Sequence, residues 1–379
     1  MSATPVLESG RYAQLGVRPV INACATLTRL GGSIMPPEVV AAMQEAARCF
    51  VDLDELQRRV GERIAMLTRN EAAYVSSGAA AGLLLATAAC TAGADAEARD
   101  RFPDLSGVKN EVIVQRLHRN GYDYAVRQVG VKLVEIGDEQ GTAAADLEQA
   151  INHRTAAVFW FQGAMNRPTE LPLPEVIRIA SSASVPVIVD AAAQLPPVEN
   201  LWRFTELGAS LVLFSGGKDL AGPQSSGLVL GRSDLVELCR INGSPNHAIG
   251  RPMKVGKEEM LGCLAAVERY VHLDHDARNV GFERTVERWN EGLRDVCGLE
   301  VRRDFPNEAG QPVPWTLVTF ETADVRESVV KALREGEPSI AVAPAGAQSI
   351  HLNPMTLREG EAGIVMRRLL EVMAEVQAT

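Results

Sequence analysis

The feature that most constrains the fold is a series of short apolar segments alternating with stretches of helical spacing. The segments lack polar alternation, which is typical of strands in a sheet covered on both faces. Strands that alternate with helices indicate an α/β fold with a mainly parallel sheet. The predicted strands span residues 72–75, 112–114, 132–136, 156–161, 185–189, 211–214 and 227–230.

The texture of the sequence changes after about residue 251. A long helical stretch over 256–293 precedes a hairpin-like region over 299–321 and a terminal helix over 359–378. A chain of 379 residues is long enough for two cores. We therefore expect an amino-terminal arm that begins the smaller domain (1–50), a large domain (51–255) and a smaller α+β domain (256–379).

Charge and cysteine usage restrict the function. The net charge of −10 argues against a nucleic-acid partner, which would require a basic surface. No secretory signal or membrane-spanning run is present, and the six cysteines form no CxxC pair. The sequence therefore predicts a cytoplasmic protein that has no membrane association, disulfide framework or metal site and acts on a small molecule.

Three predicted strands end in residues that can carry chemistry, and ligands of open α/β sheets bind at such ends. The first strand turns through Ser77, Gly78 and Ala79 into a helix of small residues. The free backbone N–H groups of a helix start favour a phosphate. A capped helix packed tightly through its small residues would produce the same pattern.

The second of these strands ends at Asp190. A carboxylate at the end of a buried strand requires a cation or several hydrogen-bond donors, and a protonated pyridine nitrogen would serve. A turn-capping aspartate is the alternative interpretation.

The third strand runs into Ser215, two glycines and Lys218. A lysine that is partly desolvated beside a sheet edge is a usable amine nucleophile, and glycines allow the backbone to direct it inward. A solvent-exposed lysine in a polar turn is the alternative.

Together the three strand ends supply a phosphate cradle, a partner for a ring nitrogen and an imine-forming amine. This order resembles the fold-type-I enzymes that use pyridoxal 5'-phosphate (PLP). The sequence is most similar to the selenocysteine-synthase-like group, which includes L-seryl-tRNA(Sec) selenium transferase and D-glucosaminate-type ammonia-lyases. The resemblance covers roughly residues 15–260 and is carried by the segments 20–23, 26–32, 77–80, 190–193, 215–218 and 222–224.

The resemblance implies a role for each residue. Lys218 would form the Schiff base with PLP, and Asp190 would pair with the pyridinium. Ser77, Gly78, Ala79 and Ser215 would bind the phosphate, and His118 would cover the ring face. The resemblance also implies at least a homodimer.

Substrate contacts are expected from side chains near the strand ends and in the amino-terminal arm. Arg116 and Arg251 are candidates to bind a carboxylate, because a guanidinium does so with two hydrogen bonds. Gln162 follows the 156–161 strand, and Thr28 lies in the arm. Surface or packing roles are the alternative for each.

Several reactions are open to such a site, and we favour a lyase. It would eliminate the β-hydroxyl of a hydroxylated amino acid or amino-sugar acid and release a 2-keto acid and ammonia. A racemase, an aldolase or a selenium-transferase-like transferase are alternatives, although an acidic chain offers no visible tRNA surface. A catalytically silent binding protein on the same fold is the alternative of another class.

Overall fold

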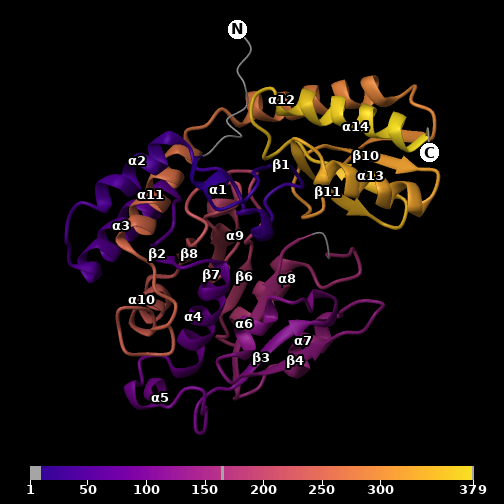
Figure 1. Cartoon of the computed structure of the whole chain (residues 1–379). Coiled ribbons are helices and arrows are strands. Elements are labelled where there is room, and N and C mark those ends of the chain that lie inside the picture. The colour runs from indigo at the N-terminus through magenta and orange to yellow at the C-terminus, as the bar shows by residue number, and fades with distance from the viewer. Residues whose placement is uncertain (1–9, 164–165, 378–379) are drawn as a thin grey trace. The chain divides into compact units, whose positions relative to one another are not determined.

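The computed structural model describes residues 10–163 and 166–377, and it divides into two compact units (Figure 1). Residues 35–273 form the larger unit, and residues 1–34 with 274–379 form the smaller one. The limits of 51–255 expected for the large domain leave out two helices that this unit contains, α2 (Pro37–Ala46) and α11 (Lys257–Val271). α11 packs against both α2 and α3 (Leu53–Leu67), so α2 and α11 belong to the larger unit.

A seven-stranded sheet forms the centre of the larger unit, in the order β2-β8-β7-β6-β5-β3-β4 (Figure 1). The pairs from β7 to β4 are parallel, whereas β8 is antiparallel to both β7 and β2. The predicted mainly parallel sheet is thus confirmed. Its strands are β2 (Ala72–Ser76), β3 (Glu111–Gln115), β4 (Lys132–Ile136), β5 (Thr155–Phe161), β6 (Val187–Asp190), β7 (Leu211–Ser215) and β8 (Gly227–Gly231).

Helices cover both faces of this sheet, which explains why most of its strand residues are apolar and buried. Apolar side chains of α4 (Ala79–Ala92), α6 (Asp123–Arg127) and α10 (Ser233–Asn242) form one core with Ile188 and Leu213. The other core joins Val189 and Val212 to side chains of α3, α11, α7 (Ala144–Ala150), α8 (Leu173–Ser182) and α9 (Asn200–Glu206). The short α5 (Ala96–Asp100) and the 3-10 turn η2 (Arg116–His118) complete the unit.

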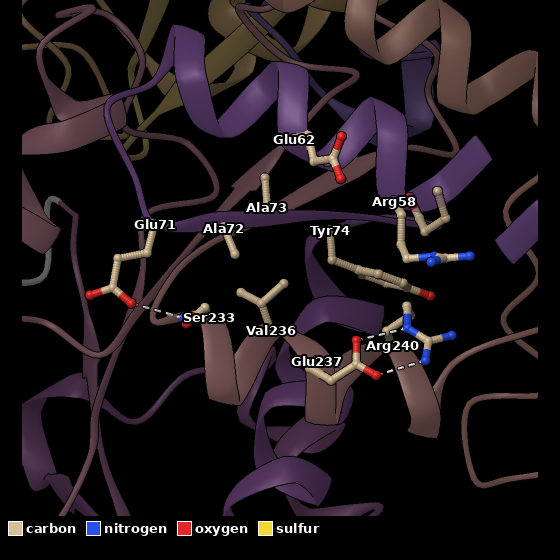
Figure 2. A pocket seen from close by; sticks show the side chains of 12 residues that line it. Arg58, Glu62, Glu71, Ala72, Ala73, Tyr74, Ser233, Val236, Glu237 and Arg240 are labelled. Carbon is tan, nitrogen blue, oxygen red and sulfur yellow. Dashed lines mark hydrogen bonds and ion pairs between the residues drawn. The ribbon is translucent and has the colours of Figure 1, made fainter. Parts of the chain in front are cut away.

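The edge strand β2 is protected by α3. The side-chain amide of Gln57 donates to the carbonyl of Val75 at 2.7 Å and accepts from its N–H at 3.2 Å, as a neighbouring strand would. Beside the start of β2 lies a cleft of about 160 Å³ between α3, β2 and α10 (Figure 2). This cleft is at the end of β2 opposite to Ser76, so it is not where the strand-end residues lie.

The smaller unit contains a five-stranded sheet in the order β1-β11-β12-β10-β9, in which only the β1–β11 pair is parallel. The expected long helix over 256–293 is two helices. The first ends at Val271, and Asp274 caps the second, because its carboxylate accepts from the N–H of Ala277 at 2.8 Å. The elements are α1 (Gly10–Gln14), β1 (Val20–Ala23), η1 (Thr28–Leu30), α12 (His275–Leu293), β9 (Leu299–Asp304), β10 (Trp315–Phe320), α13 (Ala323–Glu335), β11 (Ser339–Ala345), β12 (Ser349–Leu352) and α14 (Glu361–Gln377).

Candidate active site

The strand register brings the predicted strand ends to one edge of the large sheet. Ser76 and Ser215 both pair with Gly227, the first residue of the antiparallel strand β8. The end of β2, the start of β8 and the end of β7 are therefore adjacent. Asp190 ends β6, the next strand after β7. This edge is where ligands of open α/β sheets bind.

The turn after β2 presents backbone donors. Gly78 is the N-cap of α4, with φ of 137°, a conformation that favours glycine. Among the described residues, no side chain caps this helix start, so its first N–H groups can serve a ligand anion. A Cβ atom at Gly227 would lie 2.6 Å from the Gly78 carbonyl carbon and 2.7 Å from the Ala79 nitrogen. Gly227 thus allows the turn to lie directly on β8.

Asp190 is a buried carboxylate, with 7% of its surface exposed. Its Oδ1 accepts a hydrogen bond from the N–H of Ala192 at 2.9 Å. Burial raises the pKa of Asp190 above the usual range of an aspartate, while the Ala192 amide and the charge of Lys218 act in the opposite direction. A further cation beside this carboxylate would favour its ionised form.

Lys218 lies half-buried in the connection from β7 to β8. The carbonyl of Gly216 accepts from the N–H of Gly222 at 2.8 Å, and the N–H of Gly216 donates to the Ser226 carbonyl at 2.9 Å. A Cβ at Gly217 would lie 2.6 Å from Gln224 Cα, so this connection is too compact for a side chain there.

These groups fit PLP. Uncapped helix amides suit its phosphate, a buried carboxylate with a raised pKa suits a protonated ring nitrogen, and a half-buried lysine suits its aldehyde. The residues that would hold the group are Ser77, Gly78, Ala79, Asp190, Ser215 and Lys218.

His118 is fully buried and held by other side chains. Its Nε2 lies 3.0 Å from Glu170 Oε2, and its ring packs edge-on against Trp160 at 4.5 Å between centroids. Trp160 belongs to the core on the α8 side of the sheet, whereas Leu213, the register partner of Asp190, belongs to the core on the α4 side. No contact among the described residues tests whether His118 covers the cofactor ring, so that role stays a prediction.

The four residues predicted to bind substrate are not brought together by any contact among the described residues. Gln162 lies nearest to the site: its N–H donates to the Asp190 carbonyl at 2.9 Å, and its Oε1 accepts from Trp160 Nε1 at 2.9 Å. Arg116 is exposed in η2, and Arg251 is half-buried in a turn after α10. Thr28 is exposed in η1, in the smaller unit.

Three residues at or near the site were missed by sequence reasoning. Gly227 was read only as the start of a strand, although a glycine opening an apolar run is a signal of close backbone approach. Glu170 and Tyr270 lie in ordinary helical or loop contexts, where nothing in the sequence marks them as partners of His118 and Asp219.

The described part of the chain has neither a metal-ligating cluster nor a membrane-spanning helix. Within residues 10–163 and 166–377, no group of three or more His, Cys, Asp or Glu side chains could hold a metal ion. No helix in these residues is both long and apolar enough to cross a membrane.

The mainly parallel sheet with helices on both faces is the fold of the fold-type-I PLP-dependent enzymes, and the strand-end residues fit that cofactor. A family model described as L-seryl-tRNA selenium transferase (SelA) matches residues 20–297, and the chain belongs to this family.

Two curated relatives match nearly the whole chain. A 5'-C-glycyluridine monooxygenase-decarboxylase from a Streptomyces species is 34% identical, covering 96% of this chain and 92% of the relative. A D-glucosaminate-6-phosphate ammonia lyase from Salmonella typhimurium is 32% identical, covering 95% and 97%. A solved structure of D-glucosaminate-6-phosphate ammonia-lyase superposes with a TM-score of 0.85 at 31% identity, covering 98% of this chain and 100% of that one. The chain is therefore a PLP-dependent enzyme.

Proposed function

We propose that this enzyme is a lyase that removes the β-hydroxyl and the α-amine of a hydroxylated amino acid or amino-sugar acid, giving a 2-keto acid and ammonia. The observation that carries the proposal is the near full-length similarity, in sequence and in structure, to D-glucosaminate-6-phosphate ammonia-lyase. An amino-sugar acid that bears a phosphate is accordingly the first substrate class to test.

Each residue at the strand-end edge has a separate role in binding the cofactor or in proton transfer. PLP, when bound, withdraws electrons from the α-carbon of the substrate and so acidifies its proton. Lys218 would hold the cofactor through its amine and would take the proton from the α-carbon of the substrate. The ionised form of Asp190 would hold a proton at the ring nitrogen, and the amides after Gly78 would bind the phosphate.

Substrate binding falls to the side chains around this edge. Arg116 and Arg251 would bind the substrate carboxylate, Gln162 would line the site beside Asp190, and Thr28 would contribute from the arm. His118 would cover the cofactor ring.

The assembly that we propose is a cytoplasmic homodimer or higher homo-oligomer without a nucleic-acid partner. Large apolar side chains stand exposed in both units, including Leu15 in one and Phe50, whose side chain is fully exposed, in the other. Such surface favours burial by a second copy. Six free cysteines fit a reducing compartment.

The first-named relative supports a second candidate, an oxygen-dependent decarboxylation of an amino acid, because it is as similar as the ammonia lyase. One experiment separates the two. The purified enzyme is incubated with D-glucosaminate 6-phosphate and other β-hydroxy amino acids, with and without oxygen. Ammonia and 2-keto acid formed in both conditions support the lyase, whereas oxygen uptake and CO₂ release support the alternative.

A Lys218→Ala variant is the control for that experiment. It should lack the visible PLP band that borohydride abolishes in the wild type, and its product formation should fall by on the order of 10³-fold or more. A variant that keeps the borohydride-sensitive band would show that another lysine holds the cofactor.

A further inference from the structure

The turn that holds Lys218 contains a strained residue. The N–H of Ala221 donates to the Lys218 carbonyl at 2.9 Å, and Ala221 has φ of 56°. This left-handed conformation costs free energy for a residue that has a Cβ atom. Such strain persists only where the surroundings hold the backbone, and it is concentrated at functional sites. The residues that hold this turn in its strained conformation therefore also affect the position of Lys218.

One face of α11 supports the turn. Gly262, Ala266 and Tyr270 are four residues apart and so share a face of the helix. A Cβ at Gly262 would lie 2.7 Å from Pro223 Cγ, and a Cβ at Gly222 would lie 3.1 Å from the Cβ of Ala266. The small residues thus let the turn pack directly on the helix.

A buried hydrogen bond completes this support. The hydroxyl of Tyr270 donates to Asp219 Oδ2 at 2.6 Å. Tyr270 is fully buried and Asp219 is 5% exposed, so the bond is shielded from water. Asp219 follows Lys218 directly in the chain. A hydrogen bond to a buried charged acceptor changes an equilibrium constant by about tenfold or more.

We propose that Asp219 and Tyr270 are positioning residues whose hydrogen bond holds the strained turn so that the Lys218 amine faces the cofactor. The inference rests on the role proposed for Lys218. In attachment, the amine nitrogen bonds the aldehyde carbon of PLP and one water molecule leaves. Without the hydroxyl of Tyr270, the turn relaxes toward conformations in which Ala221 has a negative φ, and the amine is presented less often.

The test measures attachment rather than turnover. The full-length holoenzyme is stripped of PLP and PLP is added back while the visible band is followed. Borohydride reduction and peptide mapping then locate the adduct. Tyr270→Phe is expected to slow attachment about tenfold. Ala221→Gly in that background should restore most of the rate, because glycine adopts a positive φ without strain.

Two further variants serve as matched controls. Tyr74→Phe removes another buried hydroxyl from the same unit, in the cleft at the start of β2, and should leave the attachment rate unchanged. Asp219→Asn keeps an oxygen that accepts from Tyr270 but removes the charge, and it should slow attachment less than Tyr270→Phe does. Thermal unfolding of each apo variant reports the structural effect separately.

The outcomes distinguish the inference from the proposed function. An unchanged attachment rate in Tyr270→Phe, or equal slowing in Tyr74→Phe, would overturn the positioning role. A wild-type adduct that maps to a lysine other than Lys218 would overturn the proposed function instead.

Discussion

The two ends of strand β2 both carry polar groups, yet they satisfy them in different ways. In the cleft at its start, Arg240 contacts Glu237, and Glu71 accepts from the N–H of Ser233 (Figure 2). Arg240 also contacts Asp54. At the sheet edge where β2 ends, α4 begins without a side-chain cap and Asp190 is bound to the Ala192 amide near Lys218.

The difference between the two ends of β2 indicates which of them requires a ligand. The charges in the cleft are already paired and partly solvated, so a ligand there would have to displace existing partners. At the strand-end edge, burial raises the pKa of Asp190, and free backbone N–H groups can bind a phosphate. A bound cofactor would supply a partner for both the carboxylate and these donors.

Of the three substitutions that test this comparison, the replacement of Asp190 is expected to have the largest effect. Asp190→Asn removes the carboxylate that holds the ring nitrogen protonated, and kcat/KM should fall on the order of 10²–10³-fold. Because burial raises its pKa, Asp190 destabilises the apo fold above its unfolded-state pKa, and that penalty shrinks as the pH falls from the folded-state pKa toward the unfolded-state value. Thermal unfolding at pH 7 should therefore show apo Asp190→Asn to be more stable than the apo wild type.

Adding PLP should reverse that order, since the cofactor supplies the missing cation to the wild type alone. If PLP stabilises both proteins equally, the contrast drawn here between the two ends of β2 fails.

A Gly227→Ala substitution should have an intermediate effect. The new Cβ would meet backbone atoms of Gly78 and Ala79, which cannot move aside as a side-chain tip can. We expect a loss of about 1–3 kcal/mol in the free energy of unfolding and weaker PLP binding. Denaturant unfolding and PLP titration measure the two effects. Gly281→Ala in α12 is the matched control, because its Cβ would have no neighbour within 4 Å.

The smallest effect is expected in the cleft. Arg240→Ala removes the guanidinium that lowers the pKa of Glu237. The pair stabilises the fold above the unfolded-state pKa of Glu237, and this contribution is lost as the pH falls through the folded-state value. Since both side chains are partly exposed, the loss at pH 7 should be about 1 kcal/mol or less, with PLP binding unchanged. A change in PLP affinity would show that the cleft communicates with the cofactor site.

Much of the fold was predictable because it follows from local pattern. Apolar runs without alternation gave every strand of the large sheet, and motifs at their ends gave Asp190 and Lys218 their place at one edge. The unit boundary near α11 was not predictable. Helical spacing continues on both sides of Asp274, and only packing assigns α11 to the larger unit.

The side chains that contact the site residues were also not predictable from the sequence. His118 ends a turn next to a strand-end residue, which is compatible with a cofactor contact or with a buried ion pair. The partner that decides its position, Glu170, is 52 residues further along the chain. The contact of Tyr270 with Asp219 likewise depends on how α11 crosses the lysine turn, which no local pattern specifies.

The antiparallel strand β8 has a consequence for the order in which the site is assembled. β7 and β8 are consecutive in the chain and adjacent in the sheet, so the lysine turn closes a local hairpin at a small cost in loop entropy. β2 and β8 are separated in sequence by most of the larger unit, and pairing between such distant segments is slow. We therefore expect the lysine turn to form early in folding and the phosphate turn to arrive late. Acquisition of the cofactor would then report that the last edge of the sheet has closed.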